Sequence, residues 1–356
     1  MTMMPTAPRD SADDTLIEVR NLRVVLPLLA GQLVAADGVS FSIRKGKTLG
    51  LVGESGCGKS MTAQSLLKIT PRFAKTTGEI LLHYADGRTV DIVGLDHDNP
   101  DLLGIRGGEA AMIFQEPMTS FSPVHTIGNQ LLETIYLHRT PDKAAAREIA
   151  LSILGRVGFP SPEEALKKYP HHLSGGMRQR AMIAMALASE PRLLIADEPT
   201  TALDVTVQAQ VLRLLKTMQR DLGMAMLYIT HDLGVIARTA DDVAVMYLGS
   251  IVEYTDVRRL FAAPKHPYTK GLMASVPRIG KRSKEPLASI RGNVPVPINK
   301  PRACGFFNRC PAAMPGLCDK AVPPLTEVAE GHRAACFLYP EVVAAADRPR
   351  EVAHAG

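Results

Sequence analysis

The feature that most constrains this chain is a short apolar run that leads into a glycine-rich loop. Thr48–Val52 is expected to form a buried strand. The next residues, Gly53-Glu-Ser-Gly-Cys-Gly-Lys-Ser60, match the pattern G-x-x-x-x-G-K-[ST]. Such glycines let the backbone curl until several N–H groups point at phosphate oxygens. A helix that begins at Lys59 adds its positive dipole end. Placed between a strand and a helix, the segment predicts a phosphate-binding loop rather than an ordinary turn.

The residue types in this loop indicate how a nucleoside triphosphate would be held. Lys59 can reach the outer phosphates, and Ser60 can ligate Mg²⁺. ATP and Mg²⁺ are therefore the expected ligands. The residues expected to surround the nucleotide are Gly53, Ser55, Gly56, Cys57, Gly58, Lys59, Ser60 and Met61.

Two carboxylates follow a second apolar strand, Leu193–Ala196. A strand of this kind places Asp197 at the carboxyl edge of the sheet, beside the phosphate-binding loop. Asp197 can then hold Mg²⁺, usually through water, and Glu198 can polarise an attacking water. Many strands end in acids, so this pattern carries weight only in combination with the loop.

A third motif, Leu173-Ser-Gly-Gly-Met-Arg-Gln-Arg180, opens a helix. Ser174, Gly175 and Gly176 at a helix N-terminus form a second surface suited to phosphate. A single ATP cannot easily use both surfaces of one subunit.

The pattern of apolar segments predicts an α/β fold, because strands alternating with helices imply a largely parallel sheet covered on both faces. The expected strands lie at Leu16–Leu26, Leu33–Ile43, Thr48–Val52, within Gly78–Val93, and at Ala111–Phe114, Leu193–Ala196, Ala225–Ile229 and Val243–Tyr247. The expected helices are Met61–Ile69, Ile127–His138, Ala144–Val157, Glu163–Tyr169 and Thr206–Leu222. After about residue 256 prolines recur, which predicts an irregular extension that does not continue the sheet.

The order of these motifs resembles the ABC ATPase family from about residue 16 to residue 256. The series runs through the phosphate loop, Gln115, Leu-Ser-Gly-Gly, apolar-Asp-Glu, Ala202-Leu-Asp204 and His231. The resemblance implies a P-loop NTPase core of ABC type, with a mostly parallel sheet, an antiparallel β subdomain and a helical insertion at about residues 116–172. It also implies a two-subunit sandwich, in which the Leu-Ser-Gly-Gly element of one subunit closes on the ATP of the other.

The same resemblance implies a role for each matching residue. Ser174, Gly175 and Gly176 would serve the partner's ATP, and Asp204 would bridge to the opposite subunit. Gln115 would sense Mg²⁺ and the γ-phosphate, which His231 would also contact. The implied catalytic set is Lys59, Gln115, Glu198 and His231, and the implied Mg²⁺ set is Ser60, Gln115 and Asp197.

One position departs from the family pattern. The family stacks adenine on an aromatic residue near the end of the first strand, where this chain has Leu26. We therefore expect apolar contact or another residue to hold the base, with a loss of selectivity of about 1 kcal/mol.

The C-terminal extension contains two further motifs. His266-Pro-Tyr-Thr269 resembles a segment of the oligopeptide, dipeptide and nickel permease ATPases. It also fits a helix that begins at a proline and packs on the core. Four cysteines, Cys304, Cys310, Cys318 and Cys336, follow within 33 residues. In a chain without signs of secretion such a group favours a metal site over disulfides. The gaps between them are wider than the Cys-x2–4-Cys pairs of structural zinc, and Cys310-Pro311 resembles cluster-binding segments. We therefore predict a [4Fe–4S] cluster, with tetrahedral zinc and free thiols as the alternatives.

The leading interpretation is the ATP-hydrolysing subunit of an importer for di- or oligopeptides, with nickel or another small solute as alternative cargo. Its expected partners are a second ATPase subunit, which the resemblance implies is a paralogue, two integral-membrane permease subunits and, indirectly, an extracytoplasmic solute-binding protein. With no apolar run of about 20 residues and no leader-like N-terminus, we expect a peripheral protein at the cytoplasmic face of the inner membrane. The expected divisions are a flexible tail 1–14, an ATPase domain 15–257, an extension 258–340 and a disordered tail 341–356.

The alternative class is a soluble ABC ATPase that acts on nucleic acid or ribosomes. Twelve Lys or Arg and one acid, Glu285, lie between Arg258 and Arg309, in a chain of net charge +5. This basic segment also fits a solvated surface or anionic lipid. The absence of coiled-coil heptads, a tandem ATPase core and an aromatic-rich face argues against nucleic acid as a partner.

Overall fold

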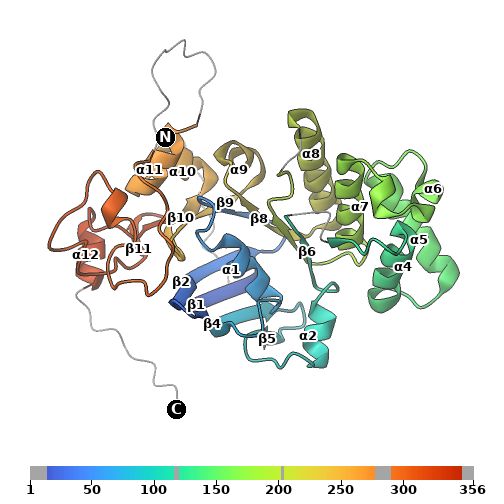
Figure 1. The fold of residues 1–356 in the computed structure, drawn as a ribbon, viewed down its shortest axis with the longest axis horizontal. Helices are drawn as coiled ribbons and strands as arrows, with labels where there is room; N and C mark the ends of the chain where they lie inside the picture. Colours follow the sequence, from blue (N-terminus) through green and yellow to red (C-terminus); the bar gives the residue numbers. More distant parts are fainter. Residues whose placement is uncertain (1–13, 116–119, 202–203, 277–289, 347–356) are drawn as a thin grey trace, which may run out of the picture.

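The computed structural model describes residues 14–115, 120–201, 204–276 and 290–346, and arranges them around two β-sheets (Figure 1). The larger sheet contains β3 (Thr48–Val52), β6 (Ala110–Ile113), β7 (Leu193–Asp197), β8 (Ala225–Thr230), β9 (Asp242–Tyr247), β10 (Ser250–Asp256), β11 (Thr326–Ala329) and β12 (His332–Ala334). The smaller sheet contains β1 (Thr15–Leu28), β2 (Gly31–Arg44), β4 (Lys75–His83) and β5 (Thr89–Asp91).

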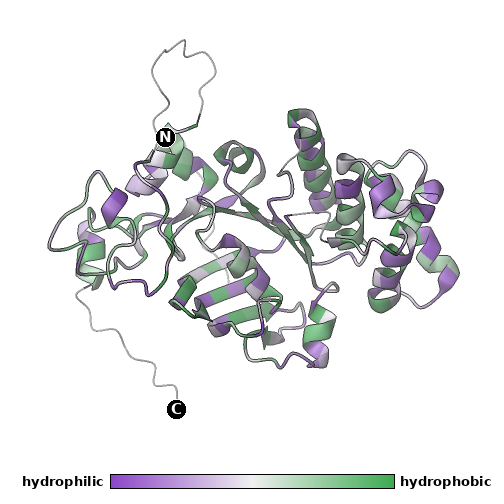
Figure 2. Cartoon of the chain, viewed as in Figure 1, coloured by the Kyte–Doolittle hydropathy of each residue, from purple (hydrophilic) through white to green (hydrophobic). Residues whose placement is uncertain are grey.

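The larger sheet has the order β11-β12-β10-β9-β3-β8-β7-β6, and its part from β9 to β6 is parallel. Side chains of each strand alternate between two apolar cores. In β7, Leu194 and Ala196 enter one core, and Leu193 and Ile195 enter the other. Burial on both faces explains why these strands are unbroken apolar runs in the sequence, which are green in Figure 2. The predicted parallel sheet covered on both faces is confirmed.

Helices cover the two faces of this sheet. On one face α1 (Lys59–Leu66) and α2 (Pro100–Ile105) share a core with the smaller sheet. On the other lie α7 (Gly175–Leu187), α8 (Val205–Leu222) and α9 (Leu233–Thr239). The smaller sheet has the order β2-β1-β4-β5 and is antiparallel throughout, as the family resemblance implied.

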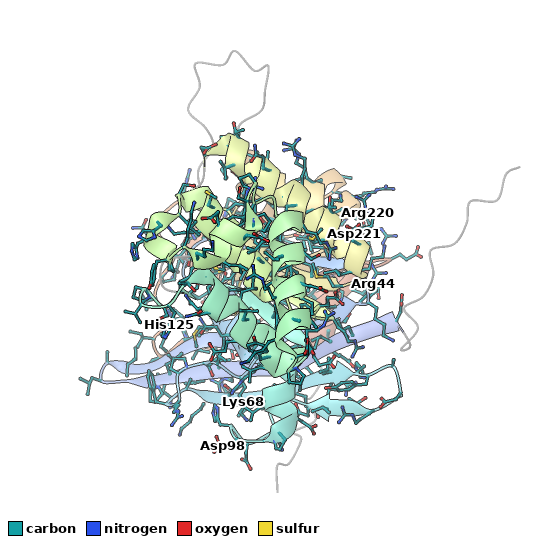
Figure 3. All side chains as sticks on the ribbon, turned by 90° about the vertical axis from the view of Figure 1, so that its right-hand side faces the viewer. Arg44, Lys68, Asp98, His125, Arg220 and Asp221 are labelled. Atoms are coloured by element: carbon teal, nitrogen blue, oxygen red, sulfur yellow. The ribbon has the colours of Figure 1, made fainter. Side chains whose placement is uncertain are left out.

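The helical insertion projects beyond the β6 edge of the larger sheet (Figures 1 and 3). It contains α4 (Ile127–His138), α5 (Lys143–Arg156), α6 (Pro162–Lys167) and the short η2 (Pro170–His172). Thr126 and Asp142 cap the first two helices by accepting backbone N–H groups. Of the polar strip 116–123 that opens the insertion, residues 116–119 lie outside the described part of the chain.

The C-terminal extension does continue the larger sheet, so the expectation that it would not was wrong. β10 pairs with β9, and β12 then pairs with β10 through Glu253 and Ala334. The extension also forms α10 (Val257–Ala262), α11 (Pro267–Ala274), the single turn η3 (Phe307–Arg309) and α12 (Pro340–Ala346). The predicted disordered tail begins at residue 341, whereas α12 occupies its first residues. A strand of three residues such as β12 is too short for its pattern to be recognised without its partner.

A buried ion pair anchors the extension to the sheet. The carboxylate of Glu253, which is fully buried, lies 2.6 Å from His332 Nε2. It also accepts the backbone N–H groups of Lys265 and His266 at 2.7 and 2.8 Å. Burial acts to raise the pKa of Glu253, but these hydrogen bonds outweigh it and lower the pKa below its usual range. The residues before α11 are thereby fixed against β10.

His266 should make the folded chain sensitive to acid. Burial lowers its pKa from 6.5 to about 4, so between these values the unfolded chain binds a proton that the folded chain does not. Stability is therefore expected to fall as pH falls through that window. His266→Asn keeps a side chain that can cap α11 but does not titrate. Between about pH 7 and about pH 5, the Tm of this variant should fall by less than the Tm of the wild-type chain, as measured by thermal unfolding. Equal losses would contradict the assignment.

Candidate functional site

The phosphate-binding loop leaves β3 and enters α1 through two close backbone approaches. A Cβ on Gly53 would lie 2.2 Å from the carbonyl oxygen of Met246, and one on Gly58 would lie 2.0 Å from that of Ala35. Gly58 also has a φ of 103°, and Gly56 has a φ of 79°. Only glycine fits these positions, because a side chain would meet backbone or adopt a strained conformation. The loop shape is therefore set by the residue pattern that predicted it.

The loop lysine points back into the loop. Lys59 is buried, and its Nζ donates to the carbonyl oxygens of Gly53 at 2.8 Å and Glu54 at 3.1 Å. Ser55 and Gly56, on the outer curve of the loop, are exposed. The ammonium group and the N-terminus of α1 thus bring positive charge to one exposed turn, which is the arrangement that triphosphate binding requires.

Asp197 and Ser60 meet where a Mg²⁺ ion was predicted. Asp197 is 3% exposed, and its Oδ1 is buried without a hydrogen-bond partner. Burial raises the pKa of Asp197, and a hydrogen bond from Ser60 lowers it in part. A buried carboxylate oxygen without a partner beside a hydroxyl is the donor set that Mg²⁺ prefers. These residues fit the ion. Met61, which follows Ser60 in α1, packs partly buried against the apolar core.

Glu198 stands beside Asp197 in a strained backbone conformation, with a φ of 45°. Its Oε2 accepts hydrogen bonds from Thr201 Oγ1 at 2.9 Å and Gln115 Nε2 at 3.3 Å. Its Oε1 lies 3.4 Å from Nδ1 of His231, whose side chain is 58% exposed. The structure therefore brings three of the predicted catalytic side chains together at one carboxylate. It also adds Thr201, which no sequence motif marked.

The Ser-Gly-Gly element lies elsewhere on the same chain. Ser174 caps α7, where its Oγ accepts the N–H of Met177 at 3.4 Å, and Gly175 is exposed beside it. α7 packs against β6, whereas the phosphate-binding loop follows β3, and β7 and β8 lie between those two strands. Within the described residues no hydrogen bond or ion pair joins this element to the loop. The two phosphate-type surfaces of one subunit are thus separate.

Two further predicted positions have local structural roles. Asp204 caps α8 by accepting the N–H groups of Thr206 at 3.0 Å and Val207 at 2.9 Å. The rest of its motif, residues 202–203, lies outside the described part of the chain. Leu26, which stands where the family has an aromatic residue, packs partly buried against the core shared by the two sheets.

Comparison with known proteins agrees with this arrangement. The ABC transporter family profile matches residues 36–201. A putative peptide import ATP-binding protein of Brucella ovis is 46% identical over 92% of this chain and 98% of its own length. The chain belongs to the ATP-binding subunits of ABC transporters. As such it is an ATP-hydrolysing subunit.

A second family profile, a further relative and a solved structure are also similar to this ABC subunit. The profile of the C-terminal region of oligopeptide/dipeptide transporters matches residues 252–318. The dipeptide transport ATP-binding protein DppD of Bacillus subtilis is 46% identical over 91% of this chain and 95% of its own length. A dimeric ATP-binding cassette bound to ADP and Pi superposes with a TM-score of 0.59 at 25% identity, over 68% of this chain and 99% of that chain.

Among the four C-terminal cysteines of this ABC subunit, Cys304 donates its backbone N–H to the carbonyl oxygen of Cys318 at 2.8 Å. Burial raises the pKa of Cys304 to about 11, with further contributions from Cys318, Cys336 and Cys310. Across the described ranges, however, no group of three or more His, Cys, Asp or Glu side chains is arranged to hold a metal ion. The predicted [4Fe–4S] cluster, and zinc as its alternative, are thus not supported by this geometry.

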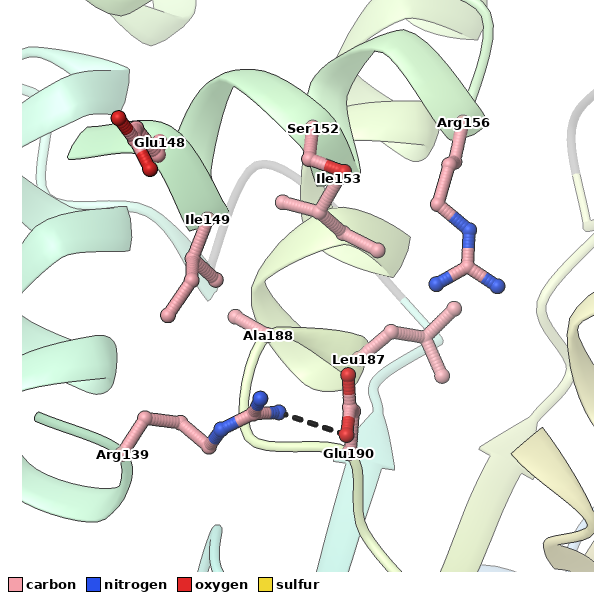
Figure 4. Close-up of a pocket in the computed structure, with 9 residues that line it drawn as sticks. All are labelled: Arg139, Glu148, Ile149, Ser152, Ile153, Arg156, Leu187, Ala188 and Glu190. Carbon is pink, nitrogen blue, oxygen red and sulfur yellow. Dashed lines mark ion pairs between the residues drawn. The ribbon is translucent and has the colours of Figure 1, made fainter. Parts of the chain in front are cut away.

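The helical insertion contains a cavity away from the nucleotide site. This cavity, of about 260 Å³, lies between α5 and the end of α7, beside an Arg139–Glu190 ion pair of 2.9 Å (Figure 4). It contains none of the predicted nucleotide-binding residues. Among the described helices, none is both long and apolar enough to cross a bilayer.

Proposed function

We propose that this chain powers a peptide importer, with dipeptides or oligopeptides as cargo. Its relatives are named for peptide import and dipeptide transport, and its region 252–318 matches the C-terminal region of oligopeptide/dipeptide transporters. The described part of that region includes α10, α11 and the residues from Cys304 to Cys318, which we call the cysteine-bearing segment. It is fixed to the ATPase core by the contacts of Glu253 with His266 and His332. The match over this region is the observation that carries the choice of cargo.

The nucleotide would be bound between two subunits. One subunit would supply the loop Gly53–Ser60, and the other would supply Ser174, Gly175 and Gly176. The separation of these surfaces within one chain supports this arrangement, as does the dimeric form of the ADP-bound cassette. Asp204 would add a contact across the interface while it caps α8.

Hydrolysis would take place at Glu198. Lys59 would bind the outer phosphates, and Ser60 with Asp197 would hold Mg²⁺, which neutralises phosphate charge when bound. Glu198 would accept a proton from the attacking water. Gln115 and His231 already contact its carboxylate from two sides, and they would align it and the γ-phosphate. Gln115 immediately follows β6, at the entrance to the insertion, so it would also report the state of the nucleotide to that subdomain.

The insertion would contact the membrane partners. We infer two integral-membrane permease subunits, a second ATPase subunit that is a paralogue, and an extracytoplasmic solute-binding protein that delivers cargo. Of the polar strip 116–123, the described end is partly exposed, and the hydroxyl of Ser122 lies 2.9 Å from Nδ1 of His125, which is labelled in Figure 3. As a subunit bound to integral-membrane permeases, the chain would take a peripheral position on the cytoplasmic face of the inner membrane.

Affinity purification from solubilised membranes tests the proposal. The full-length chain should co-purify with two multi-spanning membrane proteins, and the ATPase activity of that complex should rise with a peptide-loaded binding protein. It should show no salt-dependent binding to nucleic acid. Recovery with ribosomes or DNA instead of membrane proteins would favour the alternative class of soluble ABC ATPase.

The iron–sulfur cluster stays a prediction, with zinc and free thiols as its alternatives. What supports it is the backbone hydrogen bond of 2.8 Å from Cys304 N to Cys318 O, which brings two of the four cysteines side by side. Anaerobic purification followed by iron and sulfide assays would test it, and colourless protein free of iron would contradict it.

A further inference from the structure

The first side chain of the phosphate-binding loop is held by the C-terminal extension. Glu54 follows Gly53, and both of its carboxylate oxygens accept hydrogen bonds from Arg309, at 2.7 and 3.0 Å. Its backbone N–H donates to the hydroxyl of Tyr268 at 2.8 Å. Two residues of the extension thus fix one residue of the loop, from 255 and 214 positions away in the sequence.

Arg309 is itself rigidly placed. Only 6% of its side chain is exposed, and its remaining donors reach the carbonyl oxygens of Arg291 at 2.9 Å and Gly292 at 3.0 Å. The guanidinium group also lies 3.4 Å from the hydroxyl of Tyr247. Exposed ion pairs contribute little, but a bidentate pair with low exposure is directional and strong. The Arg309–Glu54 contact therefore restrains the conformation of the phosphate-binding loop.

Tyr268 is held by an aromatic cluster that joins three parts of the chain. Its ring lies 4.7 Å from that of Tyr247, in β9, and 5.4 Å from that of Phe306, in the cysteine-bearing segment. Tyr268 itself belongs to α11 and is fully buried. Packing of these rings leaves its hydroxyl little freedom except to meet the N–H of Glu54.

The charge of Glu54 also needs a partner when nucleotide binds. The loop brings positive charge to a triphosphate, whereas a carboxylate inside the same loop opposes that charge. Arg309 neutralises the carboxylate and keeps it turned toward the extension. Lys59 donates to the carbonyl oxygen of the same residue, so a displaced Glu54 would also disturb the lysine.

We propose that Arg309 and Tyr268 are positioning residues for ATP: they hold Glu54, and through it the phosphate-binding loop, in its nucleotide-binding shape. Arg309 in addition removes a charge that would repel the triphosphate. The proposal rests on the assignment of residues 53–60 as the ATP phosphate site. The extension then acts on the ATPase site directly, in addition to packing beside it.

Equilibrium titration of the full-length chain with Mg-ATP tests this. Arg309→Ala should raise the Kd for ATP about tenfold. Arg309→Lys keeps the charge but loses the bidentate contact, so it should give a smaller increase. Adding Glu54→Gln to Arg309→Ala should bring the Kd back to within about threefold of wild type, because the unpaired charge is gone. A role in stability alone would not produce this rescue.

The control is Arg259→Ala, which removes a more exposed ion pair from the same extension. Arg259 binds Asp256 at 3.0 Å in α10, so its loss should leave the Kd for ATP unchanged. Lys59→Ala tests the underlying assignment. If it binds ATP like wild type, the phosphate site lies elsewhere. If Lys59→Ala loses ATP binding while Arg309→Ala binds ATP like wild type, the positioning role is overturned and the phosphate site stands. If Arg309→Ala weakens binding but Glu54→Gln fails to rescue it, the charge role of Arg309 is overturned.

Discussion

Glu198→Gln is expected to lower kcat for ATP hydrolysis by about 10³-fold while leaving ATP binding close to that of the wild-type chain. Glutamine has the size of glutamate and can still accept the hydrogen bonds from Thr201 and Gln115. It cannot accept a proton from water, however, so the bound nucleotide should persist. Steady-state turnover of the purified complex, with nucleotide retention on gel filtration, measures both effects. The variant should accumulate as a nucleotide-bound dimer.

A second glutamate provides the matched control. Glu190 also has a positive φ, of 53°, but it follows α7 rather than β7, and it pairs with Arg139 of the insertion. Glu190→Gln should therefore keep wild-type turnover. If Glu198→Gln also kept it, the proton acceptor would have to be another group, and the strained backbone at Glu198 would need a different explanation.

The parallel core and the loop were predictable because local pattern and tertiary role coincide there. Strand β7 is apolar along almost its whole length since both of its faces are buried, and this burial is visible in its sequence. Gly53 and Gly58 are glycines because backbone passes within van der Waals contact of them. At such positions the structural requirement dictates the residue type, so the residue type reveals the structure.

The role of the extension was not predictable from the sequence. Its contacts join residues that are far apart in the chain, and each contact involves too few residues to produce a recognisable pattern. Arg309 is one of twelve basic residues in its segment, and nothing in their spacing marks it as the partner of Glu54. The three residues of β12 acquire meaning only through β10, where Glu253 requires His332. Pairing across such distances is decided by tertiary packing, which local propensity does not record.

Gly175→Asp should strongly lower the ATPase activity of the assembled transporter complex without destabilising the fold. It is the most direct test of the two-subunit site. A Cβ at Gly175 would meet no atom within 4 Å, and the residue is exposed at the N-terminus of α7. An aspartate there is even favourable for the helix, since its charge complements the helix dipole. Against a partner's triphosphate the same charge is repulsive and the added side chain occupies the contact surface. We expect ATPase activity to fall by about 10²-fold or more.

The isolated Gly175→Asp subunit should nevertheless bind ATP with wild-type affinity, because its own phosphate-binding loop is unchanged. Gly104→Asp is the matched control: Gly104 also lies in a helix and is exposed, and a Cβ there would likewise meet no atom within 4 Å, but it faces no predicted partner. An unaltered ATPase rate for Gly175→Asp in the assembled complex would mean that each chain encloses its nucleotide by itself.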